Sequence, residues 1–511
     1  MNIAIRADAS SEIGTGHVVR CRSLAQELVQ RGAHVRFICR AHRGNLIASL
    51  IEQNFEVSVL STDGASATFQ PSGYSSWLGV DQLEDARQTV ISGCRPDWMI
   101  VDHYGIDAGW ESVVRETGCK VLVVDDLANR RHVADALLDQ NYSDALETRY
   151  RDLVPRTCNR LLGPRYALLS GEYAARRLAL RQRSGDVRRV MIFFGGSDQC
   201  DATGLAVDAL SCEALADVEA DVIVGVNYPH IERLREKAAK RGNTIVRPPL
   251  DTLVDVMAEA DLAIGAGGTT TWERLCMGVP SVIVTIADNQ VPASTALDRD
   301  KLAVYAGDVR DLDVNRLRET LVRVIRDSSF VRKLSETGKE LVDGCGRSRV
   351  ADVLLGGSQM LTLRPALPQD VLLYFQWAND PAVRANSFSS DPIALETHSA
   401  WYANRLADAD CEMFVLCDGC SPVGQIRFDI RDGVAEIDYS IDHSARGRGM
   451  GKALLMLGTA ELVNRGVGNF RGKVKTENVA SSRAFEAAGF ASAETDGAIR
   501  IFVKTAGAYV D

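Results

Sequence analysis

The sequence predicts an α/β protein in which two doubly wound parallel-sheet domains are followed by a smaller third domain. The chain has 511 residues, enough for about three domains of ordinary size. Short apolar runs alternate with longer amphipathic runs over residues 1–165 and again over 166–345. Such alternation is typical of right-handed βαβ units, whose parallel sheet is covered by helices. Glycine-rich stretches then predict a linker at 346–359, before a third domain at 360–511.

The expected strands are the short apolar runs of these alternating units. They are 2–7, 35–39, 98–101 and 121–124 in the first domain, and 189–194, 222–226, 244–247, 262–264 and 281–285 in the second. Ligands of open α/β sheets bind outside the carboxyl ends of the strands. The polar residues that directly follow these runs are therefore the first candidates for site residues.

Composition and charge restrict the classes of function. The net charge is −10, whereas nonspecific nucleic-acid binding depends on clustered Lys and Arg. The chain has no run of about eighteen apolar residues, and its first residues lack the basic-then-apolar pattern of a signal peptide. Cys417 and Cys420 have the spacing of a metal pair, but the Asp-Gly between them is typical of a hairpin turn. We expect a cytoplasmic protein with no metal, nucleic-acid or membrane partner.

The loop after the first expected strand contains the strongest candidate for a catalytic base. It runs from Asp8 through Gly14 and Gly16 to His17, where helical periodicity begins. A neutral imidazole in a cleft can accept a proton from water, and Asp8 is a candidate to orient it. The alternative is a histidine that caps the helix or packs in the core. For a histidine in such a loop, we favour the functional role.

Polar residues also follow three later strands of the first domain. Asp102 and Tyr104 come after the run WMIV, the pair 125–126 after VLVV, and the segment 139–141 after ALL. Each can face a sugar site at this edge of the sheet. Each can equally cap the following helix, which is the commoner role of Asp and Asn after a strand.

The second domain has two glycine-rich loops at strand ends, which predict a nucleotide site. Glycines allow the backbone to approach a phosphate closely, and threonines and helix N–H groups can hold it. Glu273, about one turn inside the following helix, is placed to accept from ribose hydroxyls, and Asn289 and Gln290 follow the next strand. Glycine turns also serve close helix–sheet packing, but two such loops at corresponding strand ends favour a nucleotide site. The candidate phosphate-binding residues are Gly196, Ser197, Gly267, Gly268, Thr269 and Thr270.

These features resemble the GT-B group of nucleotide-sugar enzymes, in which the second domain holds UDP. The more specific motif is Arg6-x-Asp8-x-Ser10-x-x-Ile13-Gly14-x-Gly16-His17-x-x-Arg20-Cys21, with Gly163-Pro164-x-Tyr166 and Gly265-Ala-Gly-Gly-x-x-x-Trp-Glu273 further on. It resembles the UDP-2,4-diacetamido-2,4,6-trideoxy-β-L-altropyranose hydrolases of pseudaminic acid biosynthesis, over roughly residues 1–345. The resemblance implies a metal-independent hydrolase that releases UDP, with His17 as the base. Gly14, Gly16, Arg20 and Tyr104 are then substrate-binding candidates.

Two stretches near the C-terminus predict a cofactor loop. Residues 435–451 read AEIDYSIDHSARGRGMG and residues 474–490 read VKTENVASSRAFEAAGF. In the first, a strand leads into a glycine-rich turn at a helix N-terminus, which presents free N–H groups to a phosphate. Together they resemble the acetyl-CoA site of GNAT acetyltransferases, over roughly residues 360–511. The resemblance implies an α+β fold, acetyl-CoA as cosubstrate, and a binding site formed by Ile441, Arg446, Gly447, Arg448, Gly449, Met450, Gly451, Asn478, Ser481 and Phe485.

Acetyl transfer needs a group that takes the ammonium proton and an acid for the leaving thiolate. Glu436 or Asp438, on the strand before the loop, can take the proton directly or through water. Their alternative role is a solvated strand face. Many GNAT members have a Tyr acid in the helix after the Asn motif, whereas this chain has Phe485 there. Tyr439 is the candidate substitute.

The two resemblances together predict a bifunctional sugar enzyme. The segment from Trp377 to Arg384 resembles the acceptor-side helix of GNAT members that acetylate amino sugars. The pseudaminic route needs N-acetylation of a C4 amine immediately before UDP is removed, so the expected partner is a UDP-linked amino sugar. Two alternatives remain: a glycosyltransferase with an appended acetyltransferase, and a hydrolase regulated by an acetyl-CoA-binding domain.

Overall fold

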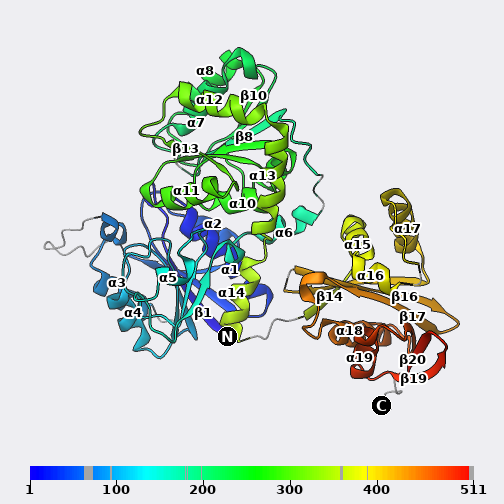
Figure 1. Cartoon of the computed structure of the whole chain (residues 1–511). Helices are drawn as coiled ribbons and strands as arrows, with labels where there is room; N and C mark the ends of the chain where they lie inside the picture. The colour runs from blue at the N-terminus through cyan, green and yellow to red at the C-terminus, as the bar shows by residue number, and fades with distance from the viewer. Residues whose placement is uncertain are drawn as a thin grey trace. The chain divides into compact units, whose positions relative to one another are not determined.

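The computed structural model describes residues 1–61, 73–92, 95–178, 180, 182–196, 198–356, 361–387, 389–419 and 421–505. The chain forms two compact units, residues 1–356 and 357–511 (Figure 1). The first unit contains two parallel sheets, and the second contains one mixed sheet.

The first sheet lies in residues 1–165 and has seven parallel strands in the order β3-β2-β1-β4-β5-β6-β7. The strands are β1 (Asn2–Ala7), β2 (His34–Arg40), β3 (Glu56–Leu60), β4 (Trp98–Asp102), β5 (Lys120–Val124), β6 (Ala136–Asp139) and β7 (Asn159–Leu162). The central strands are almost continuously apolar because helices cover both faces of the sheet. The helices are α1 (Gly16–Gln30), α2 (Ile47–Glu52), η1 (Gly73–Leu78), α3 (Gln82–Ile91), α4 (Ala108–Arg115), α5 (Leu146–Arg149) and η2 (Pro164–Tyr166).

The second sheet repeats the doubly wound order with six parallel strands, β10-β9-β8-β11-β12-β13. The strands are β8 (Arg189–Phe193), β9 (Glu219–Ile223), β10 (Thr244–Arg247), β11 (Leu262–Gly265), β12 (Ser281–Thr285) and β13 (Val304–Asp308). The helices are α6 (Gly171–Leu178), α7 (Ala202–Leu210), η3 (Glu213–Leu215), α8 (Ile231–Arg241), α9 (Val254–Glu259), α10 (Thr270–Cys276), η4 (Asp288–Gln290), α11 (Val291–Arg299), α12 (Val314–Ile325), α13 (Ser328–Leu341) and α14 (Gly346–Leu355). The pair of doubly wound domains is the predicted architecture.

Most of the predicted linker at 346–359 is instead a helix. Helix α14 buries Val350, Ala351 and Leu354 in the core of the first domain. Its first glycine is required by close packing, because a Cβ at Gly346 would lie 2.2 Å from a backbone oxygen of the first unit. Its last glycine, Gly356, ends the helix with a φ of +65°, a conformation that favours glycine. Gly346 and Gly356, two of the glycines that suggested a linker, therefore belong to a packed helix.

The second unit is built on a seven-stranded sheet in the order β14-β15-β16-β17-β18-β20-β19. Its strand pairs are antiparallel except β17 with β18. The strands are β14 (Leu361–Pro365), β15 (Cys411–Asp418), β16 (Ser421–Arg431), β17 (Val434–Ile441), β18 (Asn469–Lys475), β19 (Ala491–Asp496) and β20 (Ile499–Thr505). This is the predicted α+β fold. The predicted hairpin joins β15 to β16, although Cys420 itself lies outside the described residues.

Helices cover both faces of this sheet (Figure 1). On one face lie α15 (Val371–Ala378), α16 (Pro381–Asn386) and α17 (Leu395–Ala407), preceded by η5 (Pro368–Asp370). On the other lie α18 (Met450–Asn464), which follows η6 (His443–Ala445), and α19 (Val479–Ala487). The core therefore divides into two layers, one on each side of the sheet.

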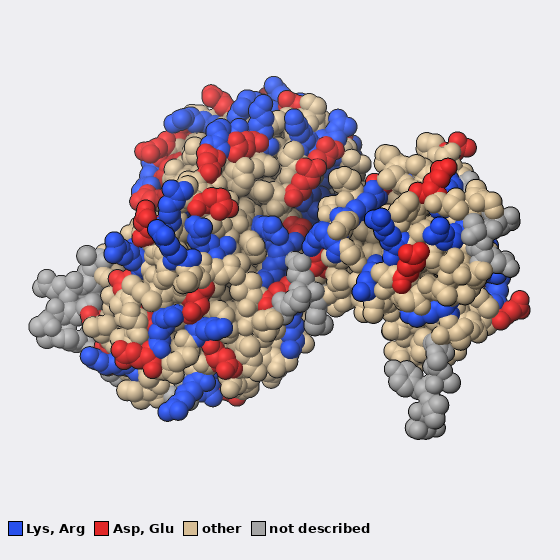
Figure 2. All heavy atoms as spheres, turned by 60° about the horizontal axis from the view of Figure 1, so that its bottom comes forward, with Lys and Arg blue, Asp and Glu red and all other residues tan. Residues whose placement is uncertain are grey.

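The drawn faces of both units carry mixed charge. Basic and acidic side chains are interspersed in Figure 2 and do not form one basic patch. Over the described ranges of the chain, no helix is both long enough and apolar enough to cross a membrane.

Candidate functional site

The first unit has its candidate site where the carboxyl ends of its two sheets meet. A Cβ at Gly196 of the second domain would lie 3.0 Å from the Thr15 hydroxyl oxygen of the first. A Cβ at Gly16 would lie 3.8 Å from the hydroxyl oxygen of Thr269. The loop before α1 therefore faces both glycine-rich loops of the second domain.

His17 is the second residue of α1, and a carboxylate holds its imidazole ring. Its Nδ1 lies 2.6 Å from Oδ1 of Asp102, at the end of β4. This contact leaves Nε2 as the ring nitrogen that can receive a proton. Arg20, one turn along α1, binds both oxygens of the same carboxylate at 2.6 and 2.7 Å. Although burial by itself raises the pKa of Asp102, the charge of Arg20 holds that pKa well below its usual range.

Asp102, and not Asp8, orients His17 in the structure. Asp8 accepts instead from Arg6 at 2.7 Å and from the backbone N–H of Arg40 at 2.7 Å. Arg6 also binds Asp85 on α3, so Asp8 belongs to a buried charge network on the other face of the sheet. The prediction that Asp8 holds the imidazole is therefore wrong.

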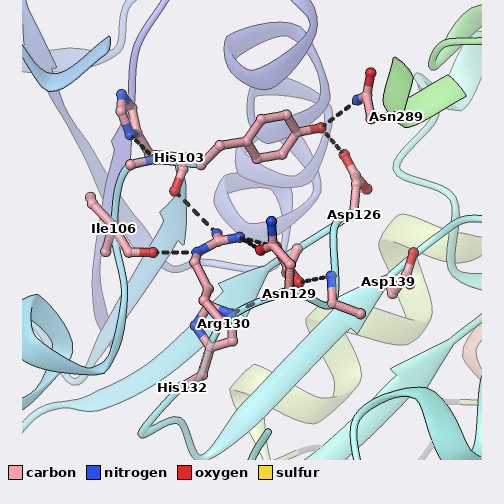
Figure 3. Close-up of polar contacts among 12 residues, drawn as sticks. His103, Ile106, Asp126, Asn129, Arg130, His132, Asp139 and Asn289 are labelled. Carbon is pink, nitrogen blue, oxygen red and sulfur yellow. Dashed lines mark hydrogen bonds and ion pairs between the residues drawn. The ribbon is translucent and has the colours of Figure 1, made fainter. Parts of the chain in front are cut away.

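Tyr104 joins the two domains at the site. Its hydroxyl donates to Asp126 at 2.7 Å and accepts from the Asn289 side chain of the second domain at 3.2 Å. Figure 3 shows Asp126 and Asn289 on either side of this hydroxyl. Arg20 donates to the same Asp126 oxygen at 2.7 Å, and Asn141 donates to the other at 3.1 Å. These strand-end residues therefore form one hydrogen-bonded group.

In the glycine-rich loop before α10, Gly267 is closely packed, whereas Gly268 has free space around it. The N–H of Gly267 donates to Gln290 at 3.1 Å, and a Cβ at this glycine would lie 2.5 Å from the Ser294 hydroxyl oxygen. Gly267 and Gln290 therefore shape the loop. Gly268 has more space, since the nearest atom to its Cβ position is the Gln290 amide nitrogen at 3.8 Å. Phosphate binding at Gly268, Thr269 and Thr270 stays a prediction, and Ser197 lies outside the described residues.

Glu273 lies on α10 as predicted and already has a partner. The Tyr173 hydroxyl of α6 hydrogen-bonds its carboxyl group. Burial raises the pKa of Glu273 to about 7, against the lowering effect of that hydrogen bond. The carboxyl group therefore titrates near neutral pH, and its contact with a ribose stays a prediction.

In the second unit, the predicted cofactor loop leads from β17 into α18. Gly447 and Gly449 have φ values of +77° and +79°, which favour glycine over any residue with a side chain. The Arg446 side chain donates to the backbone oxygen of Ile441 at 3.1 Å and pairs with Asp380 at 2.8 Å. Arg446 therefore fixes the base of the loop.

The residues around the start of α18 differ in what their side chains contact. Arg448 pairs with Asp418 at 3.1 Å, and the Met450 side chain is buried in the core. A Cβ at Gly451 would lie 3.3 Å from the Ala484 side chain of α19, so this glycine lets the two helices pack closely. The backbone N–H groups at the start of α18 remain the candidates for the pyrophosphate.

Strands β17 and β18 separate next to this loop. Strand β17 pairs with β16 as far as Ile441, but with β18 only as far as Ile437. Tyr439 lies in the separated part, and its hydroxyl lies 3.1 Å from the Ser481 hydroxyl oxygen. Asn478 accepts from the Ser481 N–H at 3.0 Å and caps α19. Burial raises the pKa of Tyr439, which keeps its hydroxyl protonated at neutral pH.

Glu436 has different surroundings from Tyr439. It pairs with Lys473 at 2.7 Å and Arg471 at 3.2 Å, and its side chain alternates to the opposite face of β17 from Tyr439. Burial alone raises its pKa, but hydrogen bonds from Lys473 and Arg471 lower it overall. These contacts favour the strand-face role, and a catalytic role for Glu436 stays a prediction.

Phe485 is a core residue. Its ring lies 5.0 Å from that of Phe490 and 5.1 Å from that of Phe502, and its side chain is 2% exposed. The prediction that it contacts the cofactor has no support in this packing. Sequence reasoning placed Asp102 and Asp126 at strand ends that can face a sugar, but it did not identify Asp102 as the partner of His17 or Asp126 as the partner of Arg20 and Tyr104. In the part of the chain described, no cluster of three His, Cys, Asp or Glu residues is arranged to hold a metal.

Comparisons with known proteins agree with this division of the chain. Residues 360–491 match the acetyltransferase (GNAT) domain family. The spore coat polysaccharide biosynthesis protein SpsG of Bacillus subtilis is 26% identical over 364 residues, covering 69% of this chain and 98% of that protein. The UDP-2,4-diacetamido-2,4,6-trideoxy-beta-L-altropyranose hydrolase of Campylobacter jejuni is 24% identical over 303 residues, covering 58% of this chain and 96% of that hydrolase.

A solved structure supports the fold of the first unit. MurG of Acinetobacter baumannii aligns with a TM-score of 0.50 at 15% identity, covering 70% of this chain and 99% of that one. This likeness supports the GT-B architecture. With the hydrolase relative and the GNAT match, it supports an enzyme that joins a hydrolase-type region to an acetyltransferase domain.

Proposed function

We propose that this protein carries out two consecutive cytoplasmic steps of pseudaminic acid synthesis. Acetyl-CoA first acetylates the C4 amine of a UDP-linked 4-amino-4,6-dideoxy sugar in the second unit. The first unit then hydrolyses the product to UDP and free 2,4-diacetamido-2,4,6-trideoxy-L-altrose. The observation that carries the proposal is the contact between His17 and Asp102, next to a loop that faces two glycine-rich loops of the second domain. The name of the Campylobacter relative supports the choice of sugar.

Hydrolysis follows from the orientation of the imidazole. Nε2 of His17 takes a proton from water while the water oxygen bonds to the anomeric carbon. The bond from that carbon to the diphosphate oxygen breaks, and its electron pair leaves with UDP. The ionised Asp102 stabilises the imidazolium that forms, because its carboxylate already binds Nδ1. The N–H groups at Gly268 to Thr270 are the proposed contacts for the departing diphosphate.

Acetyl transfer uses the gap between β17 and β18. The neutral sugar amine attacks the thioester carbon, and the bond from that carbon to sulfur breaks. The Tyr439 hydroxyl, next to Ser481, donates a proton to the leaving thiolate. The amine proton passes to water or to a strand carboxylate. Acetyl-CoA supplies the acetyl group, and its pyrophosphate binds the backbone at 447–451.

Replacing Tyr439 by Phe is expected to lower the kcat for acetylation by about tenfold, with little change in the KM for acetyl-CoA. The effect is modest because a thiol with a pKa of about 8.5 leaves readily even without an acid. Initial rates of CoA release measure it, and UDP release from the same preparation serves as the internal control. A kcat within twofold of wild type would remove Tyr439 from the acid role.

A mass-spectrometric time course tests the whole proposal. The purified chain receives the UDP-linked 4-amino sugar with or without acetyl-CoA, and with no other acceptor. The expected products are free diacetamido sugar, UDP and CoA, formed only when acetyl-CoA is present. An acetylated product that stays linked to UDP would keep the acetyltransferase and favour a glycosyltransferase for the first unit. UDP release without CoA formation would favour a regulatory acetyl-CoA domain.

A further inference from the structure

Three aromatic side chains of the first domain form a wall beside His17. We define this aromatic wall as Tyr74, Trp77 and Tyr104. The His17 ring lies 4.7 Å from that of Tyr104 and 6.2 Å from that of Trp77, between ring centroids. Trp77 stacks on Tyr104 at 5.6 Å, and Tyr74 lies 4.8 Å from Trp77 and 5.1 Å from Tyr104. The proposed base therefore has an apolar surface on one side.

The fold holds this wall in place. Tyr74 and Trp77 both lie on η1. Leu78, the last residue of that helix, is 1% exposed and anchors it in the core. A Cβ at Gly105 would lie 2.7 Å from the backbone oxygen of Tyr74, so only glycine allows the segment to approach the end of β4 this closely. The Tyr104 side chain is fixed at its other end by Asp126 and Asn289. The wall is therefore a built surface and not a chance contact of side chains.

The polar and apolar sides of the site differ in what they offer a sugar. On the polar side, Arg20 and the hydroxyl group of Tyr104 both donate to Asp126. On the other side, Trp77 is only partly buried, and its ring centroid lies 6.2 Å from that of the imidazole. A sugar hydroxyl against an aromatic ring loses its hydrogen bonds to water, whereas a methyl group gains from leaving water. Such a surface favours a deoxygenated carbon.

We propose that Trp77, supported by Tyr74, determines the specificity of the hydrolase site. It selects UDP-sugars that have a methyl group at C6 over those that have a hydroxymethyl group. This inference rests on the proposed hydrolysis, and it assigns to named residues the recognition of the 6-deoxy sugar class. Recognition of one such group by an apolar surface is worth about 10- to 200-fold in kcat/KM.

The test compares two substrates on the full-length protein: the UDP-linked 2,4-diacetamido-2,4,6-trideoxy sugar and its 6-hydroxy counterpart. The wild type is expected to prefer the deoxy sugar by about 10- to 100-fold in kcat/KM. Trp77→Ala is expected to lower kcat/KM for the deoxy sugar by about the same factor while changing the hydroxy sugar little. Trp77→Phe keeps an aromatic ring and is expected to retain most of the preference. Trp98→Phe, at the opposite end of β4, is the matched control and is expected to leave the preference unchanged.

The outcomes separate this inference from its alternatives. An equal loss for both sugars in Trp77→Ala would mean a structural role and would overturn it. A weaker inhibition by UDP alone in that variant would mean that Trp77 stacks on the base, which also overturns it. If the wild type hydrolyses neither sugar, the proposed hydrolysis fails. The affinity of the protein for each sugar, measured by calorimetry, then tests the role of the aromatic wall independently of hydrolysis. A binding preference that Trp77→Ala removes would uphold the wall, and equal binding of both sugars by the wild type would refute it.

Discussion

Replacing His17 by Ala is expected to lower UDP release from the acetylated substrate by about 10³-fold or more, while acetylation stays within twofold of wild type. The imidazole is the one proposed proton acceptor for the attacking water, and general base catalysis typically contributes about 10² to 10⁴-fold. Asp102 cannot replace it, because Arg20 binds both of its oxygens. The two rates are measured in one mass-spectrometric assay, so the acetylation rate reports on the integrity of the sample.

An exposed histidine provides the matched control for this change. His34 lies at the start of β2 with a side chain that is 57% exposed, and it pairs only with Glu56 at 3.2 Å among the contacts described. His34→Ala is expected to leave both rates unchanged. Hydrolysis by His17→Ala at a rate near that of wild type would show that another group activates the water.

Replacing Asp102 by Asn is expected to lower the kcat for hydrolysis by about 10² to 10⁴-fold, with a much smaller change in KM. An asparagine amide that donates to Nδ1 of His17 leaves the proton on Nε2, where the ring can no longer accept one from water. The neutral residue also removes the negative charge that stabilises the imidazolium. The kcat is measured over a range of pH, together with the midpoint of thermal unfolding.

The buried position of Asp102 makes a second readout necessary. Arg20 loses one of its two carboxylate partners in this variant but keeps Asp126, so some loss of stability is expected. Asp107→Asn is the control, since Asp107 caps α4 and asparagine is an equally good cap. A lower unfolding temperature with an unchanged pH profile and kcat would mean that Asp102 has a structural role only.

The architecture was predictable wherever strands are buried on both faces. The runs at 2–7 and 281–285 coincide with strands, because a central parallel strand is a nearly continuous apolar sequence. The missed strands β3, β7 and β13 all lie at sheet edges, and β7 has only four residues. Edge strands expose part of their surface to water, so their apolar pattern is weaker. The alternation of runs supplied the two doubly wound domains, and the resemblance to GNAT acetyltransferases supplied the α+β fold of the third domain.

The alternation of side chains along β1 and β4 explains why Asp102, and not Asp8, contacts His17. Ala7 and Asp102 lie opposite each other in the β1–β4 pair, and side chains alternate between the two faces of a sheet. Trp98 and Ile100 belong to the core that also contains residues of α1, so Asp102 continues towards α1 and His17. Asp8 is one residue past Ala7 and points towards α3. The sequence shows which residues share a face of the sheet, because side chains alternate along a strand. It does not show which helix covers that face.

The return of α14 to the first domain has a consequence for expression. Because α14 packs against α1, the acetyltransferase is attached to the domain that contains His17. One chain therefore contains both the hydrolase-type region and the acetyltransferase domain, and the cell makes the two in a one-to-one ratio. If acetylation precedes hydrolysis, a change in expression alters the capacity for both steps in the same proportion.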